Sequence, residues 1–392
     1  MSPRCFFVAI TVLLMTVLTA CPPGTPGQGE YRGFRYTELS GKTIRIDGYI
    51  GDNMDIQIPS RINGLPVTEI GVIAFKDTGL TSVVIPDTVT EIGIGAFLGN
   101  SIKNVDIPGS VTTIGIDAFC NNLLEDLNLP EGITVIGEGA FSINRLTHVT
   151  IPPGLIYIER GVFSYNMLKE IDIPNNIEAI GGWAFLNNLL TDLTIPGNVK
   201  VVGFGAFADN LLTNVNIMDG VAVIDYSAFA RNDLASVEIP DSVNLILDSA
   251  FASNELTKLT LPDGISEIRS RTFERNLLEN VVIPSGVTGI LEGAFQQNRL
   301  TSVTISDSVE LIGEWSFANN RLSEIIIPAG VREIRTGAFE DNDIIRVTIS
   351  ADVFIEARHG RATVSPGFDN FYLDNGRRAG TYVLENGAWR MD

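Results

Sequence analysis

The residue types most often used for nucleophilic and acid–base catalysis are scarce in this chain of 392 residues. Histidine occurs only at His148 and His359, and a Ser-His-Asp or Cys-His arrangement requires a base held by an orienting acid. Thr147 and Val149 flank His148, so we expect a solvated histidine on an outward strand position. A glycan-cleaving enzyme would need a close pair of carboxylates, which the sequence does not suggest. We therefore predict that the protein is not an enzyme.

Thiol, metal and phosphate chemistry also lack a clear signature. Cys120 is the one cysteine after residue 21; we favour an inert, partly buried thiol over the alternative of a reactive one. Zinc sites need clusters of Cys and His, and no Gly-rich loop leads from a strand into a long helix. Calcium binding is an alternative for the aspartates that follow the strands. These residues are spaced by whole repeats, and aspartate is a typical turn former, so we favour a role in turns. They are Asp87, Asp241, Asp263 and Asp307. We expect neither a metal ion nor a cofactor.

Aromatic side chains are the remaining candidates for a binding site. Trp183, Phe204 and Tyr226 each lie in the two positions before an Ala-Phe pair, and Trp315 takes the same place further along the chain. Exposed, adjoining aromatic residues are common anchors for a protein partner. The alternative is that these rings lie flat over neighbouring parts of the chain as packing.

The chain is organised by one period of 22 residues. Phenylalanine recurs thirteen times at this spacing without an insertion: Phe75, Phe97, Phe119, Phe141, Phe163, Phe185, Phe207, Phe229, Phe251, Phe273, Phe295, Phe317 and Phe339. Self-similarity of this kind predicts a solenoid, in which each coil leaves an apolar face that its neighbours cover. We expect the phenylalanines to stack into a column inside the coils.

Each repeat can be assigned to parts of one coil. A segment such as Leu80-x-x-Val83-x-Ile85 alternates as a strand with one buried face, and a proline usually follows and ends it. We therefore expect one parallel sheet, with a short helical or 3₁₀ turn at each Ala-Phe pair on the opposite wall. Asparagine also recurs with the period, from Asn100 to Asn342, and should form an internal hydrogen-bond ladder between coils.

The repeat resembles the leucine-rich repeat of the BspA-like bacterial surface proteins, whose core reads Ile-Pro-x-x-Val-x-x-Ile-Gly-x-x-Ala-Phe. The resemblance covers about three quarters of the chain, and the segment from Ile58 to Gly71, with its five-residue insertion, is similar to the first repeat of that family. It implies a right-handed leucine-rich-repeat coil with β caps at both ends. It also implies attachment to host extracellular matrix proteins or to other bacterial cells.

The first thirty residues have the features of an export signal and a tether. Arg4 precedes an apolar run too short to span a bilayer as a mature helix, and the run ends in Leu18-Thr19-Ala20-Cys21. This pattern is similar to a bacterial lipoprotein signal, which implies cleavage after residue 20 and lipidation of Cys21; the alternative is an ordinary secretory signal. We assign residues 1–20 to the signal peptide and residues 21–30 to a flexible tether rich in proline and glycine.

The rest of the chain divides into caps and solenoid. Short alternating segments in residues 31–58 predict an N-terminal β cap, which would cover the open end of the sheet. Residues 59–350 form the solenoid of thirteen repeats. In residues 351–392, two Asn-Gly pairs lie between alternating segments that start at Phe371 and Thr381, and we predict a C-terminal β-hairpin cap.

Taken together, these features predict a surface-anchored, non-enzymatic lipoprotein that binds proteins and acts in adhesion. The residue after Cys21 is Pro22 and not an aspartate, which by analogy with bacterial sorting rules favours the outer membrane, and we expect display at the cell surface. The alternative is a lipoprotein that faces the periplasm and scaffolds envelope proteins. With a formal charge of −20, the protein should repel nucleic acid and anionic headgroups beyond its anchor.

Overall fold

The chain forms two units, which meet in sequence at Leu190 and Thr191. The structure is a computed structural model and describes residues 27–356 and 362–392. The predicted signal peptide, Cys21 and most of the tether therefore lie outside the described residues. Residues 28–30, which we assigned to the tether, belong instead to the first strand, Gln28–Tyr31.

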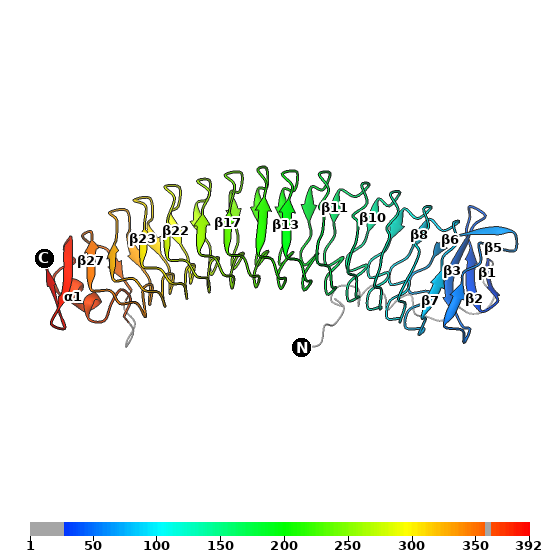
Figure 1. Cartoon of the computed structure of the whole chain (residues 1–392), viewed down its shortest axis with the longest axis horizontal. Helices are drawn as coiled ribbons and strands as arrows, with labels where there is room; N and C mark the ends of the chain where they lie inside the picture. Colours follow the sequence, from blue (N-terminus) through cyan, green and yellow to red (C-terminus); the bar gives the residue numbers. More distant parts are fainter. Residues whose placement is uncertain (1–26, 357–361) are drawn as a thin grey trace. The chain divides into compact units, whose positions relative to one another are not determined.

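Each unit is a parallel β-solenoid with about 22 residues per turn, as predicted. Within each unit, Figure 1 shows successive coils placing their strands side by side. The short strands of the coils lie in two rows, of which the first is incomplete in the N-terminal unit. The first row is the predicted Val-x-Ile segment. The second row was not predicted. It holds the second conserved Ile or Val of each repeat, which glycine follows in only some coils, and the residue before it; Val135 pairs with Thr113 and Ile136 with Ile114.

The described residues of the N-terminal unit, 27–190, form twelve strands. Its cap and first coil hold β1 (Gln28–Tyr31), β2 (Phe34–Glu38), β3 (Ile44–Tyr49), β4 (Asp55–Gln57) and β5 (Arg61–Ile62). The first row of the solenoid contributes β7 (Ser82–Val84). The second row holds β6 (Leu65–Ile70), β8 (Glu91–Ile92), β9 (Thr113–Ile114), β10 (Val135–Ile136), β11 (Tyr157–Ile158) and β12 (Ala179–Ile180).

The C-terminal unit contains a longer regular array. Its first row holds β13 (Asp192–Ile195), β15 (Asn214–Ile217), β17 (Ser236–Glu238), β19 (Lys258–Thr260), β21 (Asn280–Val282), β23 (Ser302–Thr304), β25 (Glu324–Ile326) and β27 (Arg346–Ile349). Its second row holds β14 (Val201–Val202), β16 (Val223–Ile224), β18 (Leu245–Ile246), β20 (Glu267–Ile268), β22 (Gly289–Ile290), β24 (Leu311–Ile312), β26 (Glu333–Ile334) and β28 (Phe354–Ile355).

The first row is less complete in the N-terminal unit than the sequence predicts. Leu127 pairs with Val149 only as an isolated bridge, and the segment around Ile171 forms no strand. Leu127 and Ile171 are nevertheless buried, as the alternation requires. A hydrophobic pattern fixes which side chains point inward, but it does not fix whether neighbouring backbones form a complete ladder.

A column of stacked phenylalanine rings runs through the interior of each unit, as predicted. Neighbouring ring centroids lie 5.0–6.0 Å apart, with ring planes within 19° of parallel. All thirteen rings are at most 1 % exposed. Burial of a phenylalanine side chain stabilises a fold by about 1.5–3 kcal/mol, so this column is a main source of stability between coils.

The Ala-Phe segment forms the third wall of the coil, and its geometry differs from the predicted helical or 3₁₀ turn. Ala96 N–H donates to Gly93 C=O and Leu98 N–H to Gly95 C=O, which makes two successive tight turns. Between the turns, Phe97 N–H donates to Ala118 C=O of the next coil at 2.8 Å. The residue that joins the two turns, Gly95, has a positive φ of 58°. A helix cannot continue through a left-handed residue, so the wall is a ladder of turns.

The predicted asparagine ladder is present in both units. The Oδ1 atom of Asn254 accepts the Leu234 N–H, while its Nδ2 donates to the carbonyls of Phe229 and Phe251 at 3.0 and 3.1 Å. The same three contacts recur at Asn320. Each amide thus satisfies one buried N–H and two buried C=O groups of two coils, which the repeat itself leaves without strand partners.

Antiparallel strands cover the start of the N-terminal unit. β2, β3 and β4 coincide with the three alternating segments predicted there. β1, β2 and β3 form a meander, and β3 then pairs in parallel with β6 of the first coil. The five-residue insertion forms a small hairpin, in which Asn63 and Gly64 both have positive φ and join β5 to β6.

The C-terminal cap contains a helix and a hairpin, so the predicted hairpin cap is right for its second part and wrong for its first. The segment from Phe371 forms the helix α1 (Phe368–Asp374), while β29 (Gly380–Glu385) and β30 (Ala388–Met391) form a hairpin around Asn386-Gly387, as predicted. Phe368 and Tyr372 are buried one turn apart on the helix, a spacing that the alternating pattern also allows. In the part of the chain described here, no helix is long and apolar enough to cross a membrane.

Candidate interaction surfaces

The outward face of the first strand row is mainly polar in the C-terminal unit, with two apolar exceptions. Val282 is 66 % exposed and Ile326 is 65 % exposed. Val282 pairs with Thr304 and Ile326 with Thr348, so the four residues occupy the same position in four successive coils. The flanking positions in these strands carry Asn280, Ser302 and Glu324, which are also exposed. We call Val282 and Ile326, with Thr304 between them, the strand-face patch.

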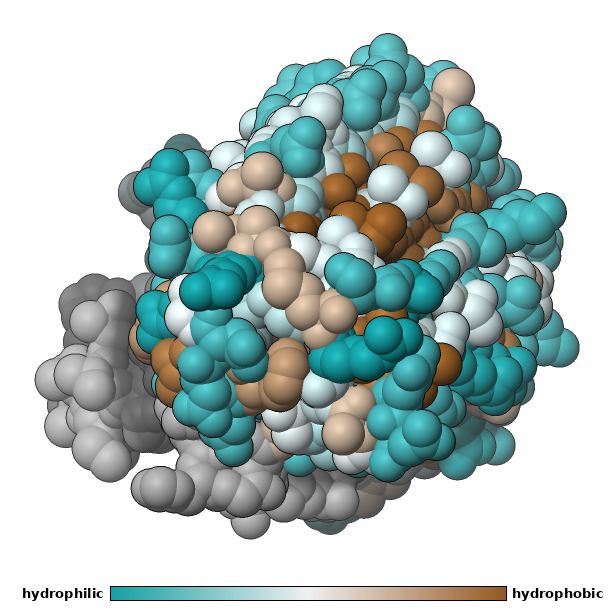
Figure 2. All heavy atoms as spheres, turned by 90° about the vertical axis from the view of Figure 1, so that its left-hand side faces the viewer, coloured by the Kyte–Doolittle hydropathy of each residue, from teal (hydrophilic) through white to brown (hydrophobic). Residues whose placement is uncertain are grey.

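The second strand row carries another group of apolar side chains on its outer face. Val201, Val223 and Leu245 are neighbours in register in β14, β16 and β18, and Leu245 is 39 % exposed. Figure 2 views the C-terminal end and shows a largely hydrophilic surface in which apolar residues gather in a band along one flank. Exposed apolar area of this kind is where water is most readily displaced by a partner.

The structure brings together two of the three aromatic residues predicted as a partner-binding cluster. Phe204 and Tyr226 pack edge to face at 6.5 Å, and each is 40 % exposed. Trp183 belongs to the N-terminal unit, where the guanidinium carbon of Arg160 lies 4.2 Å from the centre of its ring. The guanidinium of Arg160 therefore covers one face of the Trp183 ring. This contact agrees with the alternative that Trp183 packs on a neighbouring coil.

Two columns of left-handed residues shape the outside of the turn wall. One lies two residues before each phenylalanine of the spine, and we call it the pre-Phe column. Its residues have φ between 53° and 68°: Ile73, Gly95, Asp117, Gly139, Gly161, Trp183, Gly205, Ser227, Ser249, Arg271, Gly293, Trp315 and Gly337. The post-Phe column lies two residues after each phenylalanine, with φ between 53° and 73°. Its residues are Asp77, Gly99, Asn121, Ile143, Tyr165, Asn187, Asp209, Arg231, Ser253, Arg275, Gln297, Asn319 and Asp341.

Left-handed backbone favours glycine, because a Cβ clashes with the following carbonyl at a cost of about 1–2 kcal/mol per residue. Glycine fills this place in many coils, yet tryptophan stands in it at Trp183 and Trp315. Bulky residues with positive φ are uncommon and often have a role outside the backbone. The sequence could have revealed these columns, since glycine, Asn, Asp and Ser recur there with the 22-residue period.

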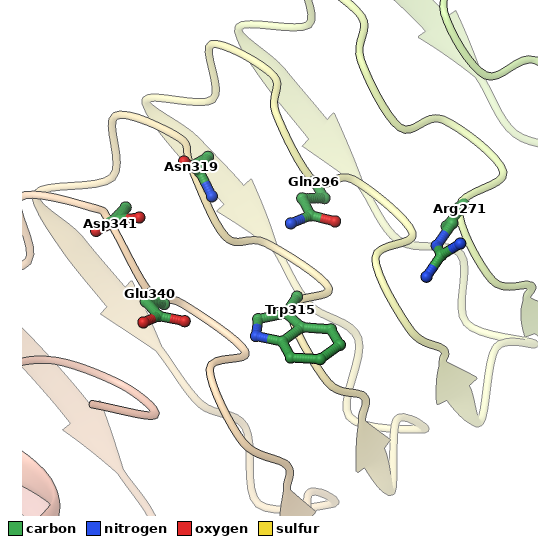
Figure 3. A pocket seen from close by; sticks show the side chains of 6 residues that line it. All are labelled: Arg271, Gln296, Trp315, Asn319, Glu340 and Asp341. Carbon is green, nitrogen blue, oxygen red and sulfur yellow. The ribbon is translucent and has the colours of Figure 1, made fainter. Parts of the chain in front are cut away.

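A shallow hollow of about 410 Å³ lies on the turn wall of the C-terminal unit. It is lined by side chains from four successive coils: Arg271, Gln296, Trp315, Asn319, Glu340 and Asp341. In Figure 3 the indole of Trp315 lies between Arg271 and Glu340, with Gln296 and Asn319 above it. Arg271 is held by Glu292, with an N–O distance of 2.5 Å.

One carboxyl group on the turn wall of the N-terminal unit has a strongly shifted proton affinity. Burial, together with the nearby charge of Glu138, raises the pKa of Asp117 to about 6. Asp117 stands in the pre-Phe column, and its carboxylate lies against Gly139, the next residue of that column. A side chain at Gly139 would collide with it.

Comparison with models of protein families identifies the family of the repeat. The model of the BspA type leucine rich repeat region, in six copies, matches residues 68–190, 180–298 and 244–357. The chain belongs to this family. No curated protein matches the sequence of this BspA-type chain.

Solved structures of similar fold come from several bacteria. A leucine rich cell surface protein from Faecalibacterium prausnitzii A2-165 is 26 % identical, with a TM-score of 0.54, over 88 % of this chain and 99 % of that one. A leucine-rich repeat protein from Bacteroides ovatus is 22 % identical, with a TM-score of 0.56, over 84 % and 90 %. The pneumococcal vaccine antigen PcpA is 16 % identical, with a TM-score of 0.53, over 89 % and 96 %.

Two of the residues considered for catalysis, His148 and Cys120, have different surroundings in the BspA-type fold. The His148 side chain is 62 % exposed, and its Nδ1 lies 3.9 Å from Glu170. Cys120 is fully buried and accepts a hydrogen bond from the Ser142 hydroxyl at 3.1 Å. His359 lies outside the described residues, and within those described no group of three His, Cys, Asp or Glu side chains could hold a metal ion.

Proposed function

We propose that this BspA-type protein is a lipid-anchored surface lipoprotein that binds other proteins in adhesion, without catalysis. Its family membership and its 26 % identity to a leucine rich cell surface protein support display at the cell surface. The lipoprotein-like sequence that ends at Cys21 supports anchoring through that residue. Several acyl chains on one residue hold a protein firmly at a membrane.

The observation that carries this proposal is the strand-face patch on a regular polar face. Val282 and Ile326 each leave about two thirds of their surface in water, surrounded by threonine, serine and asparagine side chains that can form hydrogen bonds. Interfaces place apolar anchors at the centre and polar groups at the rim. The strands are short and parallel, so a partner would meet fixed side chains at a repeat of roughly 4.8 Å.

A binding assay tests the adhesion part. The purified protein is titrated against a panel of host extracellular matrix proteins and against bacterial cells, and saturable binding to at least one is expected. The double substitution Val282→Asp and Ile326→Asp should weaken this binding by about tenfold or more, because it places charges at the anchor positions. Val84→Asp is the matched control, since Val84 occupies the same strand position in the N-terminal unit and is 52 % exposed. Absence of binding to every panel member would contradict adhesion.

A second experiment tests the anchor and the direction that the protein faces. Protease treatment of intact cells should remove the wild-type protein, whereas a periplasmic protein would survive. Cys21→Ala should release the protein from the membrane fraction, since the acyl chains would have no attachment site. Retention of the Cys21→Ala variant in the membrane would overturn the lipid anchor, and protection from the protease would favour a periplasm-facing scaffold instead.

A further inference from the structure

The hollow around Trp315 owes its shape to an alternation in the pre-Phe column. Four successive coils place Arg271, Gly293, Trp315 and Gly337 there. A Cβ atom at Gly337 would come within 2.6 Å of the Cδ1 and Nε1 atoms of Trp315. The indole therefore lies against the glycine of the next coil. On the other side, a Cβ atom at Gly293 would come within 3.2 Å of Arg271 Cγ and Gln296 Oε1, so these two side chains lie over this glycine and border the hollow.

The backbone gains nothing from the large side chains that line this space. Arg271 and Trp315 have φ of 58° and 53°, a region in which glycine is relaxed and bulky residues are strained. Asn319 and Asp341 have φ of 56°, which asparagine and aspartate tolerate. The neighbouring coils show that glycine fits the pre-Phe column. The two strained residues, Arg271 and Trp315, line the same hollow, so we look for their role in what the hollow binds.

The chemistry of the lining fits a sugar. An indole offers a flat apolar surface, on which the C–H face of a pyranose ring can stack. The amides of Gln296 and Asn319 both donate and accept hydrogen bonds, and carboxylates accept them from hydroxyl groups. Glu340 and Asp341 provide such carboxylates at one side of the indole (Figure 3). The volume is at the lower end of the range of about 300–1,000 Å³ for small-ligand sites.

The charges argue against an anionic ligand. Arg271 is the one cationic side chain that lines the hollow, and it is already paired with Glu292. Two carboxylates face it across the indole, so a phosphate, sulfate or uronic acid group would meet net repulsion. The hollow is also too polar for a lipid chain. We propose that it binds a neutral pyranose residue of a glycan. This inference is independent of the strand-face patch, which lies on a different wall of the coil.

Glycan binding can be tested with the intact purified protein. It is screened on an array of neutral and acidic oligosaccharides built from glucose, galactose, mannose and their N-acetylated or acidic derivatives. The neutral oligosaccharides that bind are then titrated by calorimetry. We expect at least one neutral glycan to bind with one site per chain. Binding of acidic glycans alone, or of no glycan at millimolar concentrations, would overturn the proposal.

The decisive variant is Trp315→Gly. Glycine relaxes the left-handed backbone at this position, so the variant should fold, with an unchanged circular dichroism spectrum, and bind the neutral glycan about tenfold more weakly. Trp183→Gly is the matched control, because Trp183 occupies the same column in the N-terminal unit, and its affinity should equal that of the wild type. Unchanged affinity of Trp315→Gly would place the sugar elsewhere and overturn the assignment.

The alternative ligand for this hollow is a peptide segment of a protein partner, since tryptophan and arginine also anchor protein partners. If Trp315→Gly abolished binding to a matrix protein while no neutral glycan bound, the hollow would be a protein site and the proposal would be wrong. The strand-face substitutions at Val282 and Ile326 should leave glycan affinity unchanged. The two sets of variants therefore separate a failure of the glycan proposal from a failure of the adhesion proposal.

Discussion

The interior and the exterior of the same corner of the coil follow opposite rules. Inside, the position of Phe229 is filled by phenylalanine in all thirteen repeats, and its ring stacks on those of Phe207 and Phe251. Outside, two residues before each phenylalanine, the pre-Phe column ranges from glycine to tryptophan. Packing fixes the interior because each ring must fit two neighbours. The exterior shares only a backbone requirement from coil to coil, so side chains of many types occupy it.

The sharpest test of this contrast compares two aromatic residues of one coil. Phe229→Ala should lower the free energy of unfolding of the region by about 3–5 kcal/mol, because it leaves a cavity in the ring stack. Tyr226→Ala, three residues earlier and 40 % exposed, should cost about 1 kcal/mol or less. Urea denaturation combined with hydrogen exchange measures both. Equal losses would show that the exterior aromatic residues are part of the core.

A second test uses adjacent asparagines. Asn320 is buried and bonds to one N–H and two C=O groups, whereas its neighbour Asn319 is exposed and left-handed. Asn320→Ala should destabilise the region by about 2–3 kcal/mol, because it leaves buried backbone groups unsatisfied. Asn319→Gly should leave the urea midpoint nearly unchanged. A large loss for Asn319→Gly would contradict the division into interior and exterior.

A third test concerns buried positions where the residue differs from the alanine that usually precedes the phenylalanine. Ser316 takes the place of the usual alanine, and its buried hydroxyl has no hydrogen-bond partner among the described residues. Ser316→Ala should raise the free energy of unfolding by about 1 kcal/mol, because it removes an unsatisfied polar group. Thr272 takes the same place in another coil, but its hydroxyl donates to Arg269 C=O at 2.8 Å. Thr272→Ala should therefore bring no gain in the thermal midpoint.

A fourth test concerns the boundary between interior and exterior, at Asp117. Its pKa is raised to about 6 in the folded state from an ordinary value of 3.8, so the folded state binds the proton more tightly than the unfolded state. Its contribution to stability is therefore present below about pH 4 and is lost as the pH rises through 6. Asp117→Asn should be more stable than the wild type at pH 7, with the difference vanishing near pH 4. Thermal midpoints across this range would measure it, and a constant difference would contradict the shifted pKa.

The interior of the fold could be predicted from the sequence because its physical demands repeat. The phenylalanine stack, the buried asparagine ladder and the first strand row each follow from a residue type that returns every 22 positions. The second strand row was missed because only two residues per coil form it, too few for a periodic pattern to identify. The helix α1 was missed although Phe368, Phe371 and Tyr372 follow the i, i+3, i+4 spacing of a helix, because the Asn375-Gly376 pair after them was taken as a hairpin turn.

The binding surfaces were only partly predictable. The sequence placed Phe204 and Tyr226 in neighbouring coils, and they do pack together. Trp315 and Arg271 are two repeats apart, so the period places them in the same column. The residue types in this column vary from coil to coil, so the sequence alone did not indicate that these two side chains line one hollow.

The asparagine ladder has a consequence for how such a chain can change its length. Asn254 contacts the backbone at fixed offsets of 20, 25 and 3 residues, and the strand pairs use an offset of one repeat. An in-frame loss or gain of one whole 22-residue repeat would therefore recreate every internal contact at the junction. Recombination between repeats could lengthen or shorten the protein without unfolding it, while bringing new outer side chains next to one another.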